Sequence, residues 1–445
     1  MTNAYLTAPL GRTFLKTAAP IVLIMLVNGL FNVVDAYFLG QFTGPDAVVA
    51  VTLVFPLFMM IIALSTLVSG GFSSVFARAH GAGQDTADIL TSACRTALGV
   101  CLVLIAGFVI WGRGLTYWIA NEAQILADMG HLYLSVLIWG APLGFALGLG
   151  IDTLRATGRL RLMTFVTLSS ALLNILFDWV LIVGLDWGVF GSAMGTLLAQ
   201  ACAFCLILFT WSMPVPRLFS RLTTSHSQQI IALGLPQSLG YVGLSLGSAV
   251  TLYALQIWQT ADYETYSGAF GLLTRLMTFV FLPLLGLSMA FQTLISNNYG
   301  AGLTLRVQSC LRIGIIAAFV YMGTMQVLFL AFAPVLGAVF VSDQAMIDTL
   351  AHIIWINSWS MVLFGPLLMI GTYYMAIGDA ARAGLLMLSR TYLFSIPLTL
   401  ALPFVFGGDG IWLAGVLAEL LVAIVTIVVL IQTKPIGWER ANIPT

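Results

Sequence analysis

Charged residues are scarce in this chain of 445 residues. Asp, Glu, Lys and Arg make up 8% of it, hydrophobic residues make up 60%, and the mean hydropathy is +1.03. A typical soluble domain carries about 25% charged residues, so these few charges could not cover a soluble surface. The composition therefore excludes a soluble protein and predicts an all-α protein that crosses a membrane many times. The formal net charge is zero, and nothing indicates a nucleic-acid partner.

Lysine is almost absent. Lys16 and Lys434 are the two lysines, and neither lies in a GxxxxGK[ST] phosphate-binding loop. A Walker-type ATPase within the chain is thus excluded, and any transport must use an ion gradient or a partner.

None of the five cysteines falls in a predicted outer loop, so no disulfide is expected. Cys202 and Cys205 form a CxxC pair inside an apolar helix, which favours ordinary packing over redox or metal chemistry.

Enzyme signatures are missing as well. No set of His, Cys and acidic residues has the spacing of a metal site, and no Ser-His-Asp trio can be placed at one depth. We therefore expect neither catalysis nor a cofactor.

Long apolar runs dominate what is present. A membrane-spanning helix needs about 20 such residues, and the chain has twelve runs of this kind. They cover roughly residues 14–39, 48–76, 89–112, 131–151, 162–184, 190–212, 229–258, 266–295, 311–333, 350–375, 384–406 and 411–432. The longest polar connection divides them six and six. This predicts an N-terminal lobe of residues 1–212, a cytoplasmic linker of residues 213–228 and a C-terminal lobe of residues 229–445.

The charges also indicate an orientation. With the N-terminus in the cytoplasm, fifteen of the seventeen Lys and Arg, Arg390 among them, lie inside or at inner helix ends. Arg113 then lies outside and Arg275 within a span. Nine of the seventeen acids lie outside. This asymmetry is what the positive-inside rule predicts, and it places both termini in the cytoplasm.

The two halves resemble each other. Four matches occur in the same order in both: Pro20 with Pro236, Gly81-Ala82-Gly83 with Gly300-Ala301-Gly302, His131 and Pro142 with His352 and Pro366, and Leu154–Gly158 with Tyr374–Gly378. Six spans are an even number, so both copies would insert with the same orientation. Parallel repeats are typical of secondary transporters that alternate access around a site at the repeat interface. Shared helix and loop punctuation without a common origin is the alternative.

Asp35 is the most informative single residue. It is the only charge in Ile21–Leu39, and a charge at bilayer depth costs about 2.5–3.5 kcal/mol on insertion scales. Asn28 and Asn32 share its helix face, since residues three and four apart point the same way. A carboxylate kept at this depth usually binds or moves an ion.

Polar groups of two other spans lie at a similar depth. Asp178 lies six residues before Gly184, Asn174 lies one turn below it on the same face, and Thr196 lies six residues after Phe190. Two carboxylates, an amide and a hydroxyl could therefore converge in the outer half of the N-terminal lobe. Alternatively, Asp178 is near enough to the interface to be solvated or to bond backbone.

This set of groups suits two coupling ions. Two carboxylates in a low-dielectric site cannot both stay ionised cheaply, so one should hold a proton near neutral pH. The same oxygens could hold Na⁺, because hard cations take oxygen ligands. We favour H⁺, since paired carboxylates suffice for it without a complete coordination shell.

The second half lacks these acids and carries other features. Arg275 and Glu419 each lie inside a span, and a buried ion pair between them is expected; a substrate-binding role for Glu419 is the alternative. Pro20 removes a backbone hydrogen bond fifteen residues before Asp35. It is either a static kink or a hinge at which the first helix bends as Asp35 gains or loses a proton.

Together these motifs resemble the multidrug and toxic compound extrusion (MATE) family along nearly the whole chain. The resemblance rests on the two six-helix sets, the Gly81-Ala82-Gly83 loop with its echo at Gly300, and LRATGRLRL after the fourth span. It also rests on NVVDAYFLG around Asp35 and on NILFDWVLIVGLDWGVFGSAMGT. LRATG departs from the commoner LRGxGD form, with Arg159 in place of the acid.

The resemblance implies two lobes around a cleft and export of cationic, lipophilic drugs in exchange for H⁺ or Na⁺. Asp35, Asn174, Asp178 and Thr196 match the first-lobe cluster of the bacterial DinF-like branch, whereas spans seven and ten lack the acids of another branch. It further implies a monomer in the bacterial inner (cytoplasmic) membrane.

Two other functions remain open. A flippase-like relative that moves a lipid-linked or anionic cargo would need basic residues in the cleft, for which Arg275 is the one candidate. A receptor or scaffold would explain neither the repeat nor the buried acids.

Overall fold

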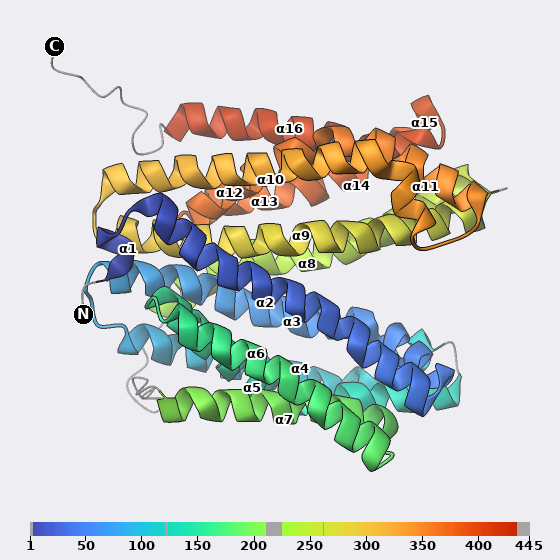
Figure 1. Cartoon of the computed structure of the whole chain (residues 1–445), viewed down its shortest axis with the longest axis horizontal. Helices are drawn as coiled ribbons and strands as arrows, with labels where there is room; N and C mark the ends of the chain where they lie inside the picture. The colour runs from blue at the N-terminus through green and yellow to red at the C-terminus, as the bar shows by residue number, and fades with distance from the viewer. Residues whose placement is uncertain (1–2, 121–122, 211–224, 261, 434–445) are drawn as a thin grey trace. The chain divides into compact units, whose positions relative to one another are not determined.

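Helices make up the described part of the protein. The computed structural model describes residues 3–120, 123–210, 225–260 and 262–433, and these residues form helices and no strand (Figure 1). Twelve helical segments are long and apolar enough to cross a membrane. The predicted all-α fold with twelve spans is thus confirmed.

The first six spans follow a short helix, α1 (Ala4–Thr7). They are α2 (Leu10–Phe38) with its π-helical continuation η1 (Leu39–Thr43), α3 (Pro45–Gly81), α4 (Ala87–Ile119), α5 (Gln124–Ala156), α6 (Leu160–Asp178) with the π-helical η2 (Trp179–Gly184), and α7 (Gly188–Thr210).

Four of the last six spans are single helices: α8 (Ser225–Trp258), α9 (Tyr263–Gly300), α10 (Thr304–Ala338) and α16 (Asp409–Thr433). The other two spans are interrupted. One consists of α11 (Gln344–Asn357), η3 (Ser358–Ser360) and α12 (Met361–Ile377), and the other of α13 (Ala380–Leu388), the π-helical η4 (Ser389–Ser395), α14 (Ile396–Ala401) and α15 (Pro403–Phe406). The helices extend beyond the predicted runs because hydropathy detects only their apolar part.

Matching helix ends support the internal repeat. Gly83 and Gly302 both have φ +71°, and Gly158 and Gly378 have φ +76° and +94°. Glycine adopts this left-handed backbone without strain, which lets the chain leave the helix. The residue after each glycine donates a backbone hydrogen bond to a carbonyl five residues earlier, as from Arg159 to Leu154. The same ending thus occurs at corresponding places in both halves.

The chain forms two compact units whose boundaries differ from the predicted lobes. Unit 1 is Met1–Ala4 with Leu23–Tyr241, and unit 2 is Tyr5–Val22 with Val242–Thr445. The first half of α2 therefore belongs to unit 2, and the first half of α8 belongs to unit 1. Most of the predicted linker, residues 213–228, lies outside the described residues.

Close helix contacts within each unit explain why α2 and α8 are each divided between the two units. In unit 1, a Cβ added at Gly71 of α3 would lie 1.8 Å from the carbonyl oxygen of Ile230 in α8. In unit 2, a Cβ added at Gly286 of α9 would lie 2.9 Å from Val22 Cγ2 in the first half of α2. Hydropathy marks where a helix crosses the membrane, whereas these contacts decide which bundle each half of it joins.

Candidate functional site

Asp35 bonds to a helix far away in the sequence. It lies near the outer end of α2 and is partly buried. Ser192 Oγ of α7 donates a hydrogen bond of 2.8 Å to Asp35 Oδ1. Both residues belong to unit 1, so the carboxylate is directed into that bundle.

Asp178 is more deeply buried. It is the last residue of α6 and is 1% exposed. Asn174 Nδ2 lies 3.3 Å from Asp178 Oδ1 and 3.4 Å from Thr196 Oγ1. The other carboxylate oxygen, Asp178 Oδ2, is buried without a hydrogen-bond partner among the described residues.

A glycine permits this burial. A Cβ added at Gly195 of α7 would lie 2.4 Å from Asp178 Oδ1, far inside the contact distance. The absence of a side chain at Gly195 therefore lets α7 pack directly against the carboxyl group of Asp178.

Helix α7 brings the two carboxylates into one site. Ser192 contacts Asp35, and Thr196, one turn further along α7, joins the Asn174–Asp178 pair. We call Asp35, Asn174, Asp178, Ser192 and Thr196 the two-aspartate site. The two carboxylates interact electrostatically with each other and with the phenol of Tyr133, which is 7% exposed on α5.

Irregular helix turns adjoin both aspartates. The π-helical η1 begins four residues after Asp35, and η2 begins directly after Asp178. Single π-helical turns inside α-helices are frequent at functional sites, because the extra residue redirects the side chains around it.

The structure thus brings together Asp35, Asn174, Asp178 and Thr196 as the sequence predicted. Asn28 lies seven residues before Asp35 on α2, and its side chain is exposed; the side chain of Asn32 lies outside the described residues. Ser192 and Tyr133 were missed. Ser192 could have been found, since it lies four residues before Thr196 on the same helix face, whereas Tyr133 carries no sequence signal.

The ion pair predicted between Arg275 and Glu419 is wrong. Glu419 of α16 pairs with Arg390 Nε of η4 instead, and Arg275 of α9 is exposed. Arg390 was expected at an inner helix end, but it lies ten residues into its span. The position of each arginine along its span could not show which of the two pairs with Glu419, because pairing also depends on how each helix is rotated about its axis.

Chemically, the two-aspartate site can accept and release a proton. It offers two carboxylates, two hydroxyls and an amide, all on membrane spans. Within the described residues, no group of three or more His, Cys, Asp and Glu could hold a metal ion. An alkali cation would have to use the hydroxyl and carboxylate oxygens, and the Asn174 amide N–H already lies against Asp178 Oδ1 and Thr196 Oγ1.

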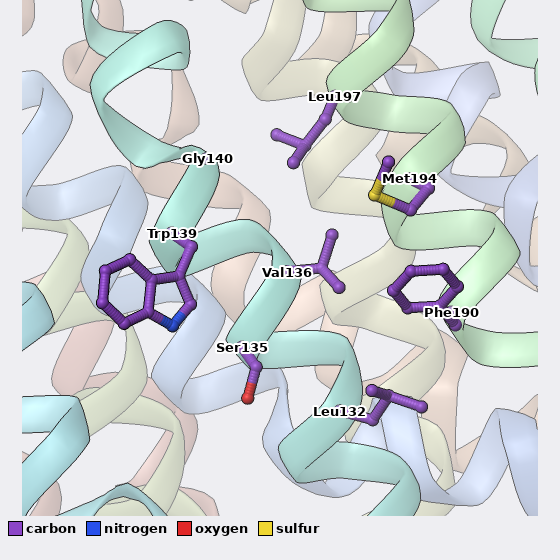
Figure 2. A pocket seen from close by; sticks show the side chains of 8 residues that line it. All are labelled: Leu132, Ser135, Val136, Trp139, Gly140, Phe190, Met194 and Leu197. Carbon is purple, nitrogen blue, oxygen red and sulfur yellow. The ribbon is translucent and has the colours of Figure 1, made fainter.

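A separate apolar groove lies on another face of α7. Its volume is about 470 Å³. Figure 2 shows the side chains of α5 and α7 that line it. Its one hydroxyl, Ser135, donates to the carbonyl oxygen of His131 in its own helix. Phe190 and Met194 line this groove, whereas Ser192 and Thr196 on the same helix contact Asp35 and Asn174. The groove therefore adds no polar group to the site.

Comparison with known proteins identifies the family. The sequence model of the MatE family matches residues 20–180 and 265–400, more than half of the chain. The match includes Asp35, Asn174 and Asp178 in the first half and Arg390 in the second.

Relatives and solved structures agree with this match. The chain is 22% identical to the "Probable multidrug resistance protein YoeA" of Bacillus subtilis, covering 78% of this chain and 77% of that protein. It is 26% identical to a "FAD transporter" of Shewanella oneidensis, covering 95% and 94%. A crystal structure of MATE in complex with MaD3S has a TM-score of 0.86 and 22% identity, covering 96% of this chain and 97% of that one.

Proposed function

Since the chain belongs to the MATE family of multidrug efflux transporters, we propose that it exports cationic, lipophilic drugs in exchange for protons by alternating access. The protein is a multi-pass membrane transporter and not an enzyme. We place it in the bacterial inner membrane as a monomer, with both termini in the cytoplasm, as the charge asymmetry predicts.

The burial of Asp178 carries the proton assignment. One of its carboxylate oxygens is buried without a partner, and a second carboxylate, Asp35, interacts with it. An unpaired buried charge is costly, and a proton on one of the two acids removes that cost. Binding a proton and releasing it to the other side of the membrane would thus switch the site between two electrostatic states.

Protons should enter and leave through Asp35. It is the less buried of the two acids, and among the described residues its one hydrogen bond comes from a hydroxyl that can also rotate away. Asp178, fully enclosed by α6 and α7, would respond to the protonation of Asp35 through their mutual repulsion.

Pro20 is proposed as the hinge. It lies two residues before α2 passes from unit 2 to unit 1, between Val22 and Leu23. A proline inside a helix removes one backbone hydrogen bond and weakens the helix there. A bend at this point would move the half of α2 that carries Asp35 while the other half stays packed in unit 2.

Sodium coupling is the second candidate. The oxygens of Asp35, Asp178, Ser192 and Thr196 are of the type that Na⁺ binds, and they lie in one bundle. Drug uptake driven separately by a pH gradient and by a Na⁺ gradient distinguishes the two ions.

The test is drug uptake into proteoliposomes driven separately by a pH gradient and by a Na⁺ gradient. We expect the wild type to work on the pH gradient alone and Asp35→Asn to fall to background. Asp46→Asn, at the exposed start of α3, is the matched control and should keep full transport. Uptake that requires Na⁺ would replace the proton by sodium at this site, and normal uptake by Asp35→Asn would remove Asp35 from the mechanism.

A further inference from the structure

Arg390 and Glu419 lie deep within the membrane spans of unit 2. Arg390 comes ten residues after Ala380, where its span begins, and Glu419 comes ten residues after Asp409, the start of the next span. At 1.5 Å per residue each lies about 15 Å from its helix end. The two spans are consecutive and antiparallel, so the distances add to about 30 Å, the thickness of the hydrocarbon core. The pair is therefore near the middle of the bilayer.

The accessible member of this pair is the cation. The side chain of Glu419 is 4% exposed, whereas that of Arg390 is 40% exposed. A charged group at this depth almost always faces the bundle interior or a water-filled cavity, because lipid would not tolerate it. The exposed part of Arg390 should thus face a space that a solute can reach.

The guanidinium keeps free donors. Its Nε pairs with Glu419 Oε1, and its two terminal nitrogens make no hydrogen bond to the residues that the structure describes. Two parallel N–H donors match the two oxygens of a carboxylate or a phosphate. Glu419 holds the guanidinium in place from one side and leaves this fork open on the other.

Aromatic rings adjoin the fork. The Cζ atom of Arg390 lies 3.9 Å from the ring centroid of Phe364 on α12. Phe364 in turn lies 5.7 Å from Phe281 of α9, measured between ring centroids. The guanidinium lies over one face of Phe364, so the apolar surface left for a planar group attached to the anion comes from the rest of that ring and from Phe281.

The charges in the middle of the spans of unit 2 are mostly positive, as a site for an anion requires. Among the described residues that lie ten or more positions from both ends of their span, there are two arginines, Arg275 and Arg390, and one acid, Glu419. The middle of this bundle therefore carries an excess of positive charge, unlike the two-aspartate site in unit 1.

We propose that Arg390, with Phe364 and Phe281, forms a binding site for an aromatic anion whose carboxylate or phosphate bonds to the guanidinium fork while its ring packs on the phenylalanines. This site goes beyond the proposed proton-coupled drug export, and binding to it requires neither an ion gradient nor Asp35. It supplies the membrane-embedded cation that an anionic cargo would need.

The test is equilibrium binding to the purified full-length protein in detergent, followed by flavin fluorescence. The probe is riboflavin 5′-phosphate, and riboflavin, which has the same ring without the phosphate, is its matched control. We expect the phosphorylated probe to bind about tenfold more tightly or better, as one charge-assisted hydrogen bond would give. Equal affinity for the two probes would overturn the proposal.

Variants locate the binding. Arg390→Gln alone leaves Glu419 buried without its partner and can destabilise the fold, so the decisive variant is Arg390→Gln with Glu419→Gln, which removes both charges together. It should lose the preference for the phosphorylated probe, and Arg275→Gln, the other arginine in mid-span, should keep it. A preference that survives the double change, or disappears in Arg275→Gln instead, would refute the site.

The outcome is independent of the coupling mechanism. Asp35→Asn should bind the phosphorylated probe as the wild type does, even where it no longer transports drugs. Loss of binding in Asp35→Asn would contradict a separate anion site.

Discussion

At the scale of single residues, the two aspartates differ in their surroundings. Asp35 accepts a hydrogen bond from Ser192 and is partly exposed, whereas Asp178 is enclosed and leaves one carboxylate oxygen without a partner. The two acids should therefore contribute differently to coupling: one exchanges the proton and the other senses it.

Asp178→Asn should weaken drug export and flatten its dependence on pH, because the amide cannot repel the carboxylate of Asp35. The measurement is the initial rate of uptake into proteoliposomes across a series of external pH values. A variant whose pH dependence equals that of the wild type would assign Asp178 to the structure of α6 rather than to coupling.

Ser192→Ala should move the midpoint of the pH dependence of transport to higher pH. The hydroxyl donates to the charged carboxylate of Asp35, and a hydrogen bond to a charged group contributes about 1.5–3 kcal/mol. Without it the protonated form is favoured at higher pH.

Ser135→Ala is the control for this experiment, because the one hydrogen bond of the Ser135 hydroxyl to the described residues goes to its own helix backbone at His131. It should leave the midpoint unchanged. A shift of the same size in both variants, or in neither, would remove Ser192 from the coupling site.

At the scale of helices, irregular turns lie at or next to the charged residues to which we assign a function. Asp35 and Asp178 precede π-helical turns, and Arg390 lies within one. An α-helix turns by about 100° per residue, so one extra residue in a turn changes which neighbour a side chain faces. This explains how apolar spans direct these polar groups into their bundles.

Pro20→Ala should slow transport more than it lowers the amount of folded protein. Alanine is about 3 kcal/mol more favourable than proline inside a helix, so the substitution stiffens α2 at the point where it changes units. The measurements are turnover in proteoliposomes and the yield of monodisperse purified protein.

Pro56→Ala tests whether any proline in a span has this effect. Pro56 lies inside α3, which belongs to unit 1 over its whole length. Its replacement should leave turnover near that of the wild type. Full activity of Pro20→Ala would instead make Pro20 a static kink.

At the scale of the whole molecule, the repeat and the charge asymmetry describe different things. The paired left-handed glycines show that the two halves end their helices in the same way. The acids and arginines within the spans break that equivalence, with carboxylates in unit 1 and an arginine–glutamate pair in unit 2. One fold repeated twice thus carries two chemically different interiors.

The orientation predicts the outcome of reporter fusions. Green fluorescent protein fused after Thr445 should fluoresce, and alkaline phosphatase inserted at Asp186, between α6 and α7, should be active, because the first reporter works in the cytoplasm and the second outside it. The opposite pair of results would invert the proposed topology.

The sequence by itself determined the features that depend on local composition. Hydropathy gave the twelve spans, the distribution of Lys and Arg gave an orientation, and helix periodicity placed Asn174 beneath Asp178 on one face. Counting from the helix ends also brought Asp35, Asp178 and Thr196 to one depth, because the rise per residue is constant.

Only the tertiary structure decided which side chains meet. Ser192 bonds to Asp35, Glu419 pairs with Arg390 rather than Arg275, and each of α2 and α8 is divided between the two units. These outcomes depend on the rotation of each helix about its axis, on π-helical turns that change that rotation, and on glycines that allow close approach. Such properties arise from packing between helices, and a sequence pattern that repeats along one helix carries no record of its neighbours.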